Sequence, residues 1–597
     1  MKLSRLYTND PELFPDIAFR GGFNVVFARV ENPLAEEEDS HNLGKSFLIR
    51  VIDFALLGGI DKSHPFRKNS DRFGHLVFYL EVETPDGQFV TVRRAVTGRA
   101  SIFVEVREGP AESLRELPDE EWTHQRLGVD AAKEIVNDAL ALTVIRPYPY
   151  RKGLGYFLRA QQDYDEVFRI SKFASGNDVD WKPFMALLLG FDDELVRSKY
   201  EVERKIEAET EYLRRTERES GAGSEEYDTV QGQIELLESR IERARGEVNA
   251  FSFREVEADV TQDVVDQVEA EIGRLNETVY SLRYELDHVR TALESGLSFD
   301  LDEVRTVFEE AGIALGEGVT RSYEELVDFN RRLIEGRRNR LRELEAQIEQ
   351  QLASIAERLS VLDRERQRAL ATLTEQRTFE KYRQLQSRLA DQERELARLH
   401  GRLAYLDRAA DIARSIQELQ ARRAELVGEI EHMVRTPPER YKAIRRAFAE
   451  YAEAVANAPA LLSVGVNTQG NLDFRAEILD RSGTRRATDE GRGTSYLKML
   501  CVAFDLALLT VYADAPFYHF VYHDGVFEGL DNRRKVRLLE LVRTLCNERG
   551  IQYILTVIDS DVPRDSADAK VLFTDDEVIR ELSDEGDLGR LFRGPAF

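Results

Sequence analysis

Four residues near the start of the chain have the types and spacing of a loop that binds phosphate: Asn42, Gly44, Lys45 and Ser46. Such a loop follows a strand and begins a helix, because backbone N–H groups at a helix start bind phosphate oxygens. Lys45 would then reach the β and γ oxygens, and the Ser46 hydroxyl would ligate Mg²⁺. The full pattern has a glycine where this chain has Asp39, so the match is partial. A capped helix start with an exposed lysine would read the same way.

A second candidate is a carboxylate at the end of a hydrophobic strand in the C-terminal part of the chain. Residues 518–524 read Tyr-His-Phe-Val-Tyr-His-Asp, which places Asp524 at the carboxyl edge of a predicted sheet. At that edge an aspartate can hold a water of a Mg²⁺ shell. A carboxylate that only begins a turn is the alternative. Further along, Asp531 falls on a second loop where a partner subunit could meet it.

A glycine-rich segment upstream of that strand offers a third set of donors. It covers residues 489–499 and leads into an apolar helix. A helix start of this kind presents N–H groups and the positive end of the helix dipole to a phosphate. A solvated turn would have a similar composition. The available donors are Gly491, Gly493, Thr494 and Ser495.

The elements that must position these residues lie in two α/β stretches at the ends of the chain. Residues 1–192 contain a strand-like run at 23–30, a helix at 47–57 and two β-rich runs around a turn at 85–87. This pattern predicts an α/β lobe with an antiparallel side sheet. Residues 437–597 return to alternating strands and helices. We expect the two stretches to be the N- and C-terminal lobes of one head.

The middle stretch, residues 193–436, has the composition of a coiled coil. Interruptions at 221–224 and 251–253 and a turn element near 295–325 divide it. Its two halves, each roughly 100 residues, can fold back as an antiparallel hairpin on the order of 150 Å long if fully helical. Two prolines, at 437 and 438, end the return helix. One apolar run with steps of three and four predicts a heptad seam with a stutter: Leu341, Leu344, Ile348, Leu352, Ile355, Leu359 and Leu362.

Composition narrows the classes of function. The chain has 597 residues, 83 of them Lys or Arg and 110 Asp or Glu, which gives a net charge of −27. This acidity argues against broad nonspecific coating of DNA and favours contacts through small basic patches. The two cysteines, Cys501 and Cys546, are too few for a disulfide framework or a four-thiolate metal site and are predicted to lie in the core. Without an apolar leader or membrane span, we expect a cytoplasmic protein with no membrane partner.

The order of these parts resembles the ABC ATPases of the class that holds SMC, RecN and the zinc-hook repair ATPases. In that class a phosphate loop comes first, then a coiled-coil hairpin, then a signature segment, an aspartate strand and a Leu-Asp loop. Within this class, two segments resemble the YydD-type branch in particular: NLGKSFLIRVIDFALLG at 42–58 and HDGVFEGLDNRR at 523–534. That branch is found in bacterial ABC-containing defence operons of the Lamassu-like or ABC-three-component kind.

The resemblance implies that ATP lies between two heads, each offering its signature segment to the phosphate loop of the other. It matches Lys45 and Ser46 to the phosphate-loop pair, Asp524 to the magnesium aspartate and Asp531 to the D-loop. Head closure in a homodimer would then move the coil and any bound DNA.

The resemblance also implies a glutamine that touches the metal and the γ-phosphate. Gln161 and Gln162 are neighbours, and the sequence leaves open which of them fills this role. A plain polar helix face would read the same way. With Gln162 in the role, the metal ligands would be Ser46, Asp524 and Gln162.

Several positions depart from the family pattern. Where the usual catalytic glutamate follows the aspartate, this chain has Gly525, which offers no base to the attacking water. Glu528 would substitute as the catalytic residue if its loop bends inward. The signature segment does not contain the residues that are usual in the family. No switch histidine follows the last strand, which ends at residues 558–561. We therefore expect slow hydrolysis of ATP, or ATP used mainly to join two chains.

The predicted hairpin tip lacks a Cys-x-x-Cys pair, which excludes a zinc hook. Just past the turn, six arginines accompany a single glutamate, Glu335. They suit contacts with DNA phosphates, or they form a solvated coil face, since Glu343 and Glu345 follow at once. The candidate DNA contacts are Arg331, Arg332, Arg337, Arg338, Arg340 and Arg342.

Together these features predict an SMC-like DNA sensor or clamp that binds ATP and Mg²⁺ as a homodimer and serves bacterial antiphage defence. A separately encoded effector or accessory subunit would do any cutting, because no cluster of residues outside the ATP motifs forms a nuclease site. One alternative is a RecN-like genome-maintenance ATPase. Another is a scaffold in which ATP locks a dimer without being hydrolysed.

Overall fold

The computed structural model describes residues 1–29, 44–62, 64–98, 102–170, 177–220, 227–250, 259–294, 317–370, 376–479, 494–564, 570–571, 573–584, 586 and 588–594. The chain divides into two compact units. The head unit comprises Met1–Glu201, Leu315–Arg321 and Arg423–Phe597, and the coil unit comprises Val202–Ala314 and Ser322–Arg422. The prediction of a mixed α/β chain rich in helix is confirmed.

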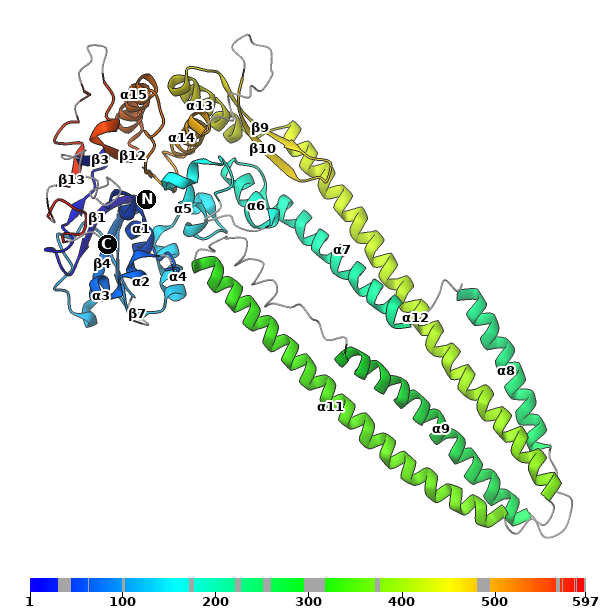
Figure 1. Ribbon diagram of the computed structural model, residues 1–597. Helices are drawn as coiled ribbons and strands as arrows, with labels where there is room; N and C mark the ends of the chain where they lie inside the picture. Colours follow the sequence, from blue (N-terminus) through cyan, green and yellow to red (C-terminus); the bar gives the residue numbers. More distant parts are fainter. Residues whose placement is uncertain are drawn as a thin grey trace. The chain divides into compact units, whose positions relative to one another are not determined.

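A five-stranded parallel sheet joins the two ends of the chain in the head unit. Its order is β13, β3, β12, β11, β8, so β3 from the N-terminal stretch lies between two strands from the C-terminal stretch. Figure 1 shows β3 beside β12. The inner strands β3 and β12 carry apolar side chains on both faces and are mostly buried, as expected for parallel sheets. Their bounds are β3 Phe23–Arg29, β8 Leu158–Arg159, β11 Phe520–His523, β12 Gln552–Ile558 and β13 Val578–Ser583.

A six-stranded antiparallel sheet forms the side sheet that the sequence predicts. Its order is β2, β1, β4, β5, β6, β7. The predicted turn at residues 85–87 joins β4 to β5, and Gly87 supplies the left-handed backbone conformation there (φ 85°). The bounds are β1 Lys2–Thr8, β2 Ile17–Ala18, β4 Val77–Glu83, β5 Phe89–Ala95, β6 Ile102–Arg107 and β7 His124–Leu127.

Helices of the head unit pack with both sheets around one hydrophobic core. Helix α14, Thr494–Val511, is the most apolar of them, and its residues from Met499 to Leu509 are all buried. A two-stranded hairpin, β9 Ala460–Val466 and β10 Leu472–Ile478, adjoins it. The other helices are α1 Lys45–Ala55, α2 Pro65–Lys68, α3 Ser70–Phe73, α4 Val129–Leu140, α5 Tyr150–Phe157, α6 Asp178–Leu188, α13 Glu439–Ala456 and α15 Asn532–Arg549. Single 3₁₀ turns lie at Asp119–Glu121, Thr143–Ile145, Gln161–Tyr164 and Asp559–Asp561.

The coil unit is built from antiparallel helix pairs. Helix α8 lies beside α12 and α9 beside α11 (Figure 1). Between α9 and α11, Glu271 pairs with Arg358 and the later Arg290 pairs with the earlier Glu345, so the two helices run in opposite directions. The helices are α7 Asp193–Ser220, α8 Tyr227–Asn249, α9 Asp259–Glu294, α11 Glu317–Leu370 and α12 Gln376–Arg435, of which α7, α11 and α12 also contribute residues to the head unit.

Most of the predicted breaks in the coil fall between these helices and outside the described residues. This holds for 221–224, for 251–253 and for the turn element up to residue 316. Residues 317–325, at the end of that turn element, are already helical in α11. Helix α12 ends at Arg435, just before the two prolines. None of the described helices is long and apolar enough to cross a membrane.

The predicted heptad seam is wrong at one position. Leu341, Ile348 and Leu352 pack against α9, and Ile348 is only 2% exposed. Leu344 is 42% exposed. At 3.6 residues per turn it lies about 60° around the helix from Leu341, outside the stripe that faces the partner helix. The contact stripe is therefore narrower than the run of leucines suggests.

Candidate functional site

The predicted phosphate loop leads directly into helix α1. Gly44 precedes it with a left-handed backbone (φ 86°), and a Cβ at this position would lie 2.8 Å from the Leu591 side chain. Only glycine satisfies both restrictions, because left-handed conformations strain other residues. Lys45 and Ser46 are the first two helical residues, and Lys45 is 4% exposed. Asn42 lies outside the described residues.

Asp524 follows β11 at the carboxyl edge of the parallel sheet and is fully buried. Its Oδ1 accepts a hydrogen bond of 2.5 Å from the Thr556 hydroxyl. Its Oδ2 has no hydrogen-bond partner in the described part of the chain. Burial raises the pKa of this carboxyl group, and the hydroxyls of Thr556 and Ser46 and the charge of Lys45 partly offset the rise. The structure thus brings Lys45, Ser46 and Asp524 together.

Glu528 reaches the same place from the loop after Asp524. Its Oε1 lies 3.3 Å from the Lys45 ammonium in an ion pair whose side chains are 26% and 5% exposed. The loop turns through two glycines with left-handed backbones, Gly525 (φ 59°) and Gly529 (φ 75°). The inward bend that the sequence analysis required of Glu528 is present.

Gly525 follows Asp524, and its surroundings leave little room for a side chain. A Cβ built at Gly525 would lie 3.2 Å from Gln161 Cγ and 3.2 Å from Glu528 Oε1. A side chain at 525 would therefore push against these two side chains and would strain the left-handed backbone. Glu528 is the acidic side chain that this loop brings to Lys45.

Of the two candidate glutamines, the fold brings Gln161 to the site. Its Nε2 donates a hydrogen bond to Glu528 Oε2. Gln161 and Gln162 are both exposed, and among the described residues the side chain of Gln162 makes no hydrogen bond to Glu528. Successive residues of a 3₁₀ turn point about 120° apart, so one of two neighbours faces the site and the other does not. Gln161, rather than the predicted metal ligand Gln162, is the residue placed beside Glu528.

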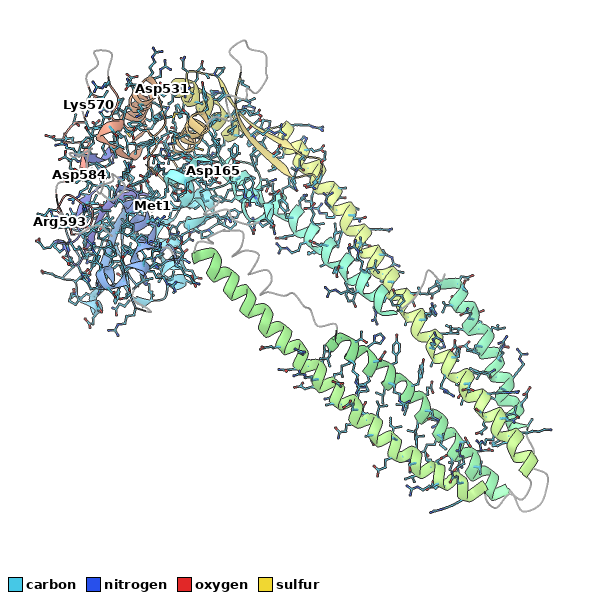
Figure 2. The ribbon with its side chains drawn as sticks, in the orientation of Figure 1. Met1, Asp165, Asp531, Lys570, Asp584 and Arg593 are labelled. Atoms are coloured by element: carbon cyan, nitrogen blue, oxygen red, sulfur yellow. The ribbon has the colours of Figure 1, made fainter. Side chains whose placement is uncertain are left out.

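Two further predicted residues, Ser495 and Asp531, meet through an arginine. The Arg534 guanidinium donates to the Ser495 hydroxyl at 2.8 Å and pairs with Asp531 at 3.2 Å. Asp531 also caps α15 by accepting a hydrogen bond from the Arg534 N–H. Asp531, labelled in Figure 2, lines an open cavity of about 450 Å³ together with Arg533, Arg534 and Arg537. Gly491 and Gly493 lie outside the described residues, as does the side chain of Thr494.

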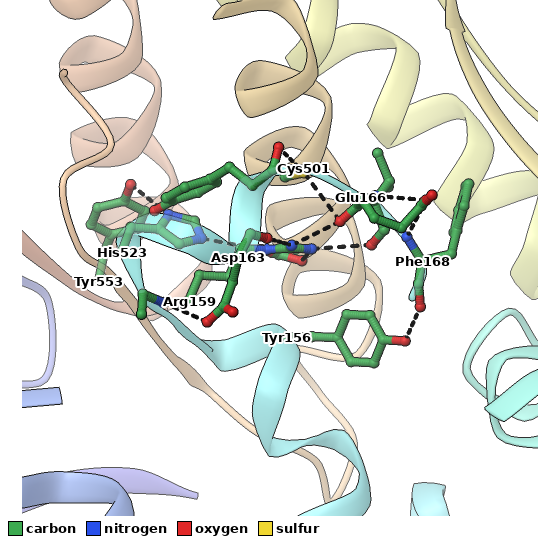
Figure 3. Close-up of polar contacts among 12 residues, drawn as sticks. Tyr156, Arg159, Asp163, Glu166, Phe168, Cys501, His523 and Tyr553 are labelled. Carbon is green, nitrogen blue, oxygen red and sulfur yellow. Dashed lines mark hydrogen bonds and ion pairs between the residues drawn. The ribbon is translucent and has the colours of Figure 1, made fainter. Parts of the chain in front are cut away.

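A buried polar network that the sequence did not predict surrounds Arg159 (Figure 3). Arg159 donates to both carboxylate oxygens of Asp505, and all atoms of both side chains are inaccessible to solvent. His523, which precedes Asp524, lies 3.1 Å from Asp505, and burial lowers its pKa. The signal in the sequence was Asp505 itself, because a carboxylate inside an apolar helix must be paired.

Arg159 also shapes the loop that carries Gln161. Its guanidinium donates to the backbone carbonyls of Asp163, Glu166 and Val167 at 2.7, 3.2 and 3.1 Å. Burial by itself would lower the pKa of Arg159, but Asp505 more than compensates, so the guanidinium is firmly charged. The network thus ties the glutamine loop to α14 and to the strand before Asp524.

The proposed DNA contacts belong to α11. Arg338, Arg340 and Arg342 are exposed. The side chains of Arg331, Arg332 and Arg337 lie outside the described residues. Among the residues that the structure does describe, no group of three or more histidine, cysteine or acidic side chains could hold a metal ion. Cys501 and Cys546 are both buried, as predicted.

The C-terminal part of the chain matches a family model, and the chain is similar to solved structures. A family model described as an uncharacterised protein conserved in bacteria (DUF2326) matches residues 451–595. No curated protein matches. One similar solved structure is the Smc head domain with a coiled coil and joint from Pyrococcus yayanosii, at 14% identity and a TM-score of 0.35, covering 96% of this chain and 98% of that one. Another is the Smc head domain with an extended coiled coil bound to the C-terminal domain of ScpA from Pyrococcus furiosus, at 13% identity and a TM-score of 0.30, covering 94% and 90%.

Proposed function

We propose that the chain binds ATP with Mg²⁺ at Lys45, Ser46 and Asp524 and hydrolyses it slowly. The observation that carries this proposal is the buried Asp524 carboxylate, one of whose oxygens has no hydrogen-bond partner among the described residues, beside a lysine at the start of α1. A buried carboxylate without a full set of partners is costly unless a cation or water completes it.

The residues present fit such a ligand. Ser46 and Asp524 offer the oxygen ligands that Mg²⁺ prefers, and Lys45 with the first N–H groups of α1 would hold phosphate oxygens. Magnesium would supply charge neutralisation at the phosphates. Gly44 allows the backbone to turn into the helix at this point, since its conformation is left-handed.

Glu528 is the best candidate for the general base. It is the carboxylate that the fold places against Lys45 and Gln161. Once phosphate oxygens bind Lys45, Glu528 would be released to accept a proton from the attacking water, which Gln161 would help to orient. Because Gly525 leaves the usual position of the base without a side chain, turnover would be slow.

The second group of residues favours a homodimer joined through ATP. Ser495 and Asp531 are bonded to Arg534. Within the described residues, no hydrogen bond or ion pair links this group to Lys45 or Asp524. Each chain would therefore offer one group to the nucleotide and the other to the partner's nucleotide.

We further propose that the ATP-dependent dimer senses or clamps DNA in the cytoplasm, as part of bacterial antiphage defence with a separate effector. The exposed arginines of α11 and the resemblance to the YydD-type branch support this role. If the arginines contact phosphates, DNA binding should weaken between low and high salt. This dependence on salt should be smaller when Arg338, Arg340 and Arg342 are replaced by alanine. Binding that is insensitive to salt would contradict a phosphate-contact mechanism.

The deciding experiment measures binding and turnover of ATP with Mg²⁺ by the full chain and by Lys45→Ala, Asp524→Ala and Glu528→Ala. We expect Lys45→Ala to lose binding, and Asp524→Ala and Glu528→Ala to lose turnover. A wild-type chain that binds no ATP would overturn the proposal. Loss of turnover in Asp524→Ala but not in Glu528→Ala would remove Glu528 from the role of base. Binding without turnover, with ATP-dependent dimerisation on a sizing column, would instead identify a scaffold in which ATP joins two chains without being hydrolysed. The glycine at position 525, which offers no base, favours this alternative.

A further inference from the structure

Lys498 on α14 holds both ends of the loop that carries Glu528. Its ammonium donates to the backbone carbonyl of Gly525 at 2.9 Å and to that of Glu528 at 2.8 Å. The residue is 7% exposed, and burial lowers the pKa of its ammonium while nearby carboxylates, Glu528 first among them, oppose this. Hydrogen bonds from an ammonium to carbonyls are stronger than those between neutral groups, so this clamp is a firm one.

The same face of α14 contacts the loop that carries Gln161. Cys501 and Asp505 follow Lys498 at steps of three and four residues, which places all three on one side of the helix. Cys501 Sγ lies 3.5 Å from the Glu166 carbonyl, and Asp505 pairs with Arg159. One helix face therefore sets the positions of two loops whose side chains, Gln161 and Glu528, meet each other.

We infer that Lys498 is a positioning residue for Glu528, an inference that rests on the proposed function. The two glycines of the loop permit many backbone conformations, and Lys498 selects the one in which the carboxylate faces Lys45 and Gln161.

The test compares Lys498→Met with Lys498→Arg in the full chain. Methionine has a similar length but donates no hydrogen bond, so we expect kcat for ATP to fall about tenfold or more, because a small misplacement of a reacting group is costly. The KM for ATP should not rise, because a displaced Glu528 no longer competes with phosphate for Lys45, and arginine should restore part of kcat. The matched control is Lys182→Met on α6, which removes another buried lysine that pairs only locally, with Asp178. An unchanged kcat in Lys498→Met would overturn the inference, as would equal losses in both methionine variants.

A double variant shows whether Lys498 acts through Glu528. Adding Lys498→Met to Glu528→Gln should lower kcat no further, since the residue being positioned is already inactive. Two independent, multiplying losses would contradict the inference. If the wild type binds no ATP, the proposed function fails first. A crystal structure of Lys498→Met then tests the inference without turnover: retention of the Glu528 contacts with Lys45 and Gln161 would overturn it.

Discussion

Lys45 and Glu528 form an ion pair of 3.3 Å across 483 positions of the sequence. The lysine begins the first helix of the head unit, and the glutamate lies in the loop after β11. In the proposed site a phosphate and Glu528 compete for one ammonium. Nucleotide binding and the position of the general base are then coupled, because binding breaks the ion pair.

The first prediction follows from this competition. Glu528→Gln should bind ATP about threefold to tenfold more tightly, since a partly buried ion pair of about 1 kcal/mol no longer has to be broken. Its turnover should fall about 100-fold or more if Glu528 is the base. Equilibrium titration and a phosphate-release assay measure the two effects. Glu540→Gln, an exposed change on α15, is the control. Unchanged affinity in Glu528→Gln would show that the pair does not compete with phosphate.

The second prediction concerns the buried pair of Arg159 and Asp505. Arg159→Met leaves a fully buried carboxylate with only His523 beside it, which should destabilise the head unit by about 3 to 5 kcal/mol. Arg159→Met combined with Asp505→Leu should recover much of that loss, because no unpaired charge remains. Thermal unfolding of the single and double variants measures the coupling. If the losses of the two single variants simply add, the two groups do not stabilise each other.

The sequence allowed the positions of Lys45 and Asp524 to be predicted because each lies at the end of an element with a clear apolar pattern. The inward turn of Glu528 was not predictable, since it depends on the backbone of Gly525 and on the distant Lys498. The choice between neighbouring glutamines likewise depends on the phase of a single 3₁₀ turn.

Charged residues within apolar segments show the same limit of prediction from sequence. Asp505 signals a buried partner, but that partner is Arg159, 346 positions away. Local patterns identify which residues are unusual, while the partner is set by the pairing of β8, β11 and β12 in one sheet. Patterns of short range therefore predicted the elements, and contacts of long range determined the site.

The third prediction tests the packing of the coil unit. Ile348→Ala should lower the free energy of unfolding of the coil by about 2 kcal/mol or more, because Ile348 is buried against α9. Leu344→Ala, four positions earlier on the same helix, should change it by less than about 0.5 kcal/mol, because Leu344 is 42% exposed. Thermal loss of the helical circular dichroism signal compares the two. Equal losses would restore the unbroken heptad seam and contradict the exposure of Leu344.

The fourth prediction concerns acid stability and His64, which caps α2 from within an aromatic cluster. Its Nδ1 accepts a hydrogen bond from the Phe66 N–H, and its ring contacts Phe47 and Phe54. Burial, reinforced by the charge of Arg50, lowers the pKa of His64 to about 4 from an ordinary value of 6.5. Between these two values the unfolded chain binds a proton that the folded chain does not. The stability is therefore complete above pH 6.5 and is lost as the pH falls toward 4.

Integrating this difference from pH 7 to pH 5 gives a loss of about 2 kcal/mol attributable to His64. His64→Asn keeps a side-chain acceptor for the Phe66 N–H but does not titrate, so it should lose less stability over the same interval. Unfolding of both proteins at the two pH values measures the difference. His75→Asn, at a histidine whose side chain is 54% exposed, should follow the wild type. If His64→Asn loses as much stability as the wild type on acidification, the buried imidazole is not the group that limits the acid stability of the head unit.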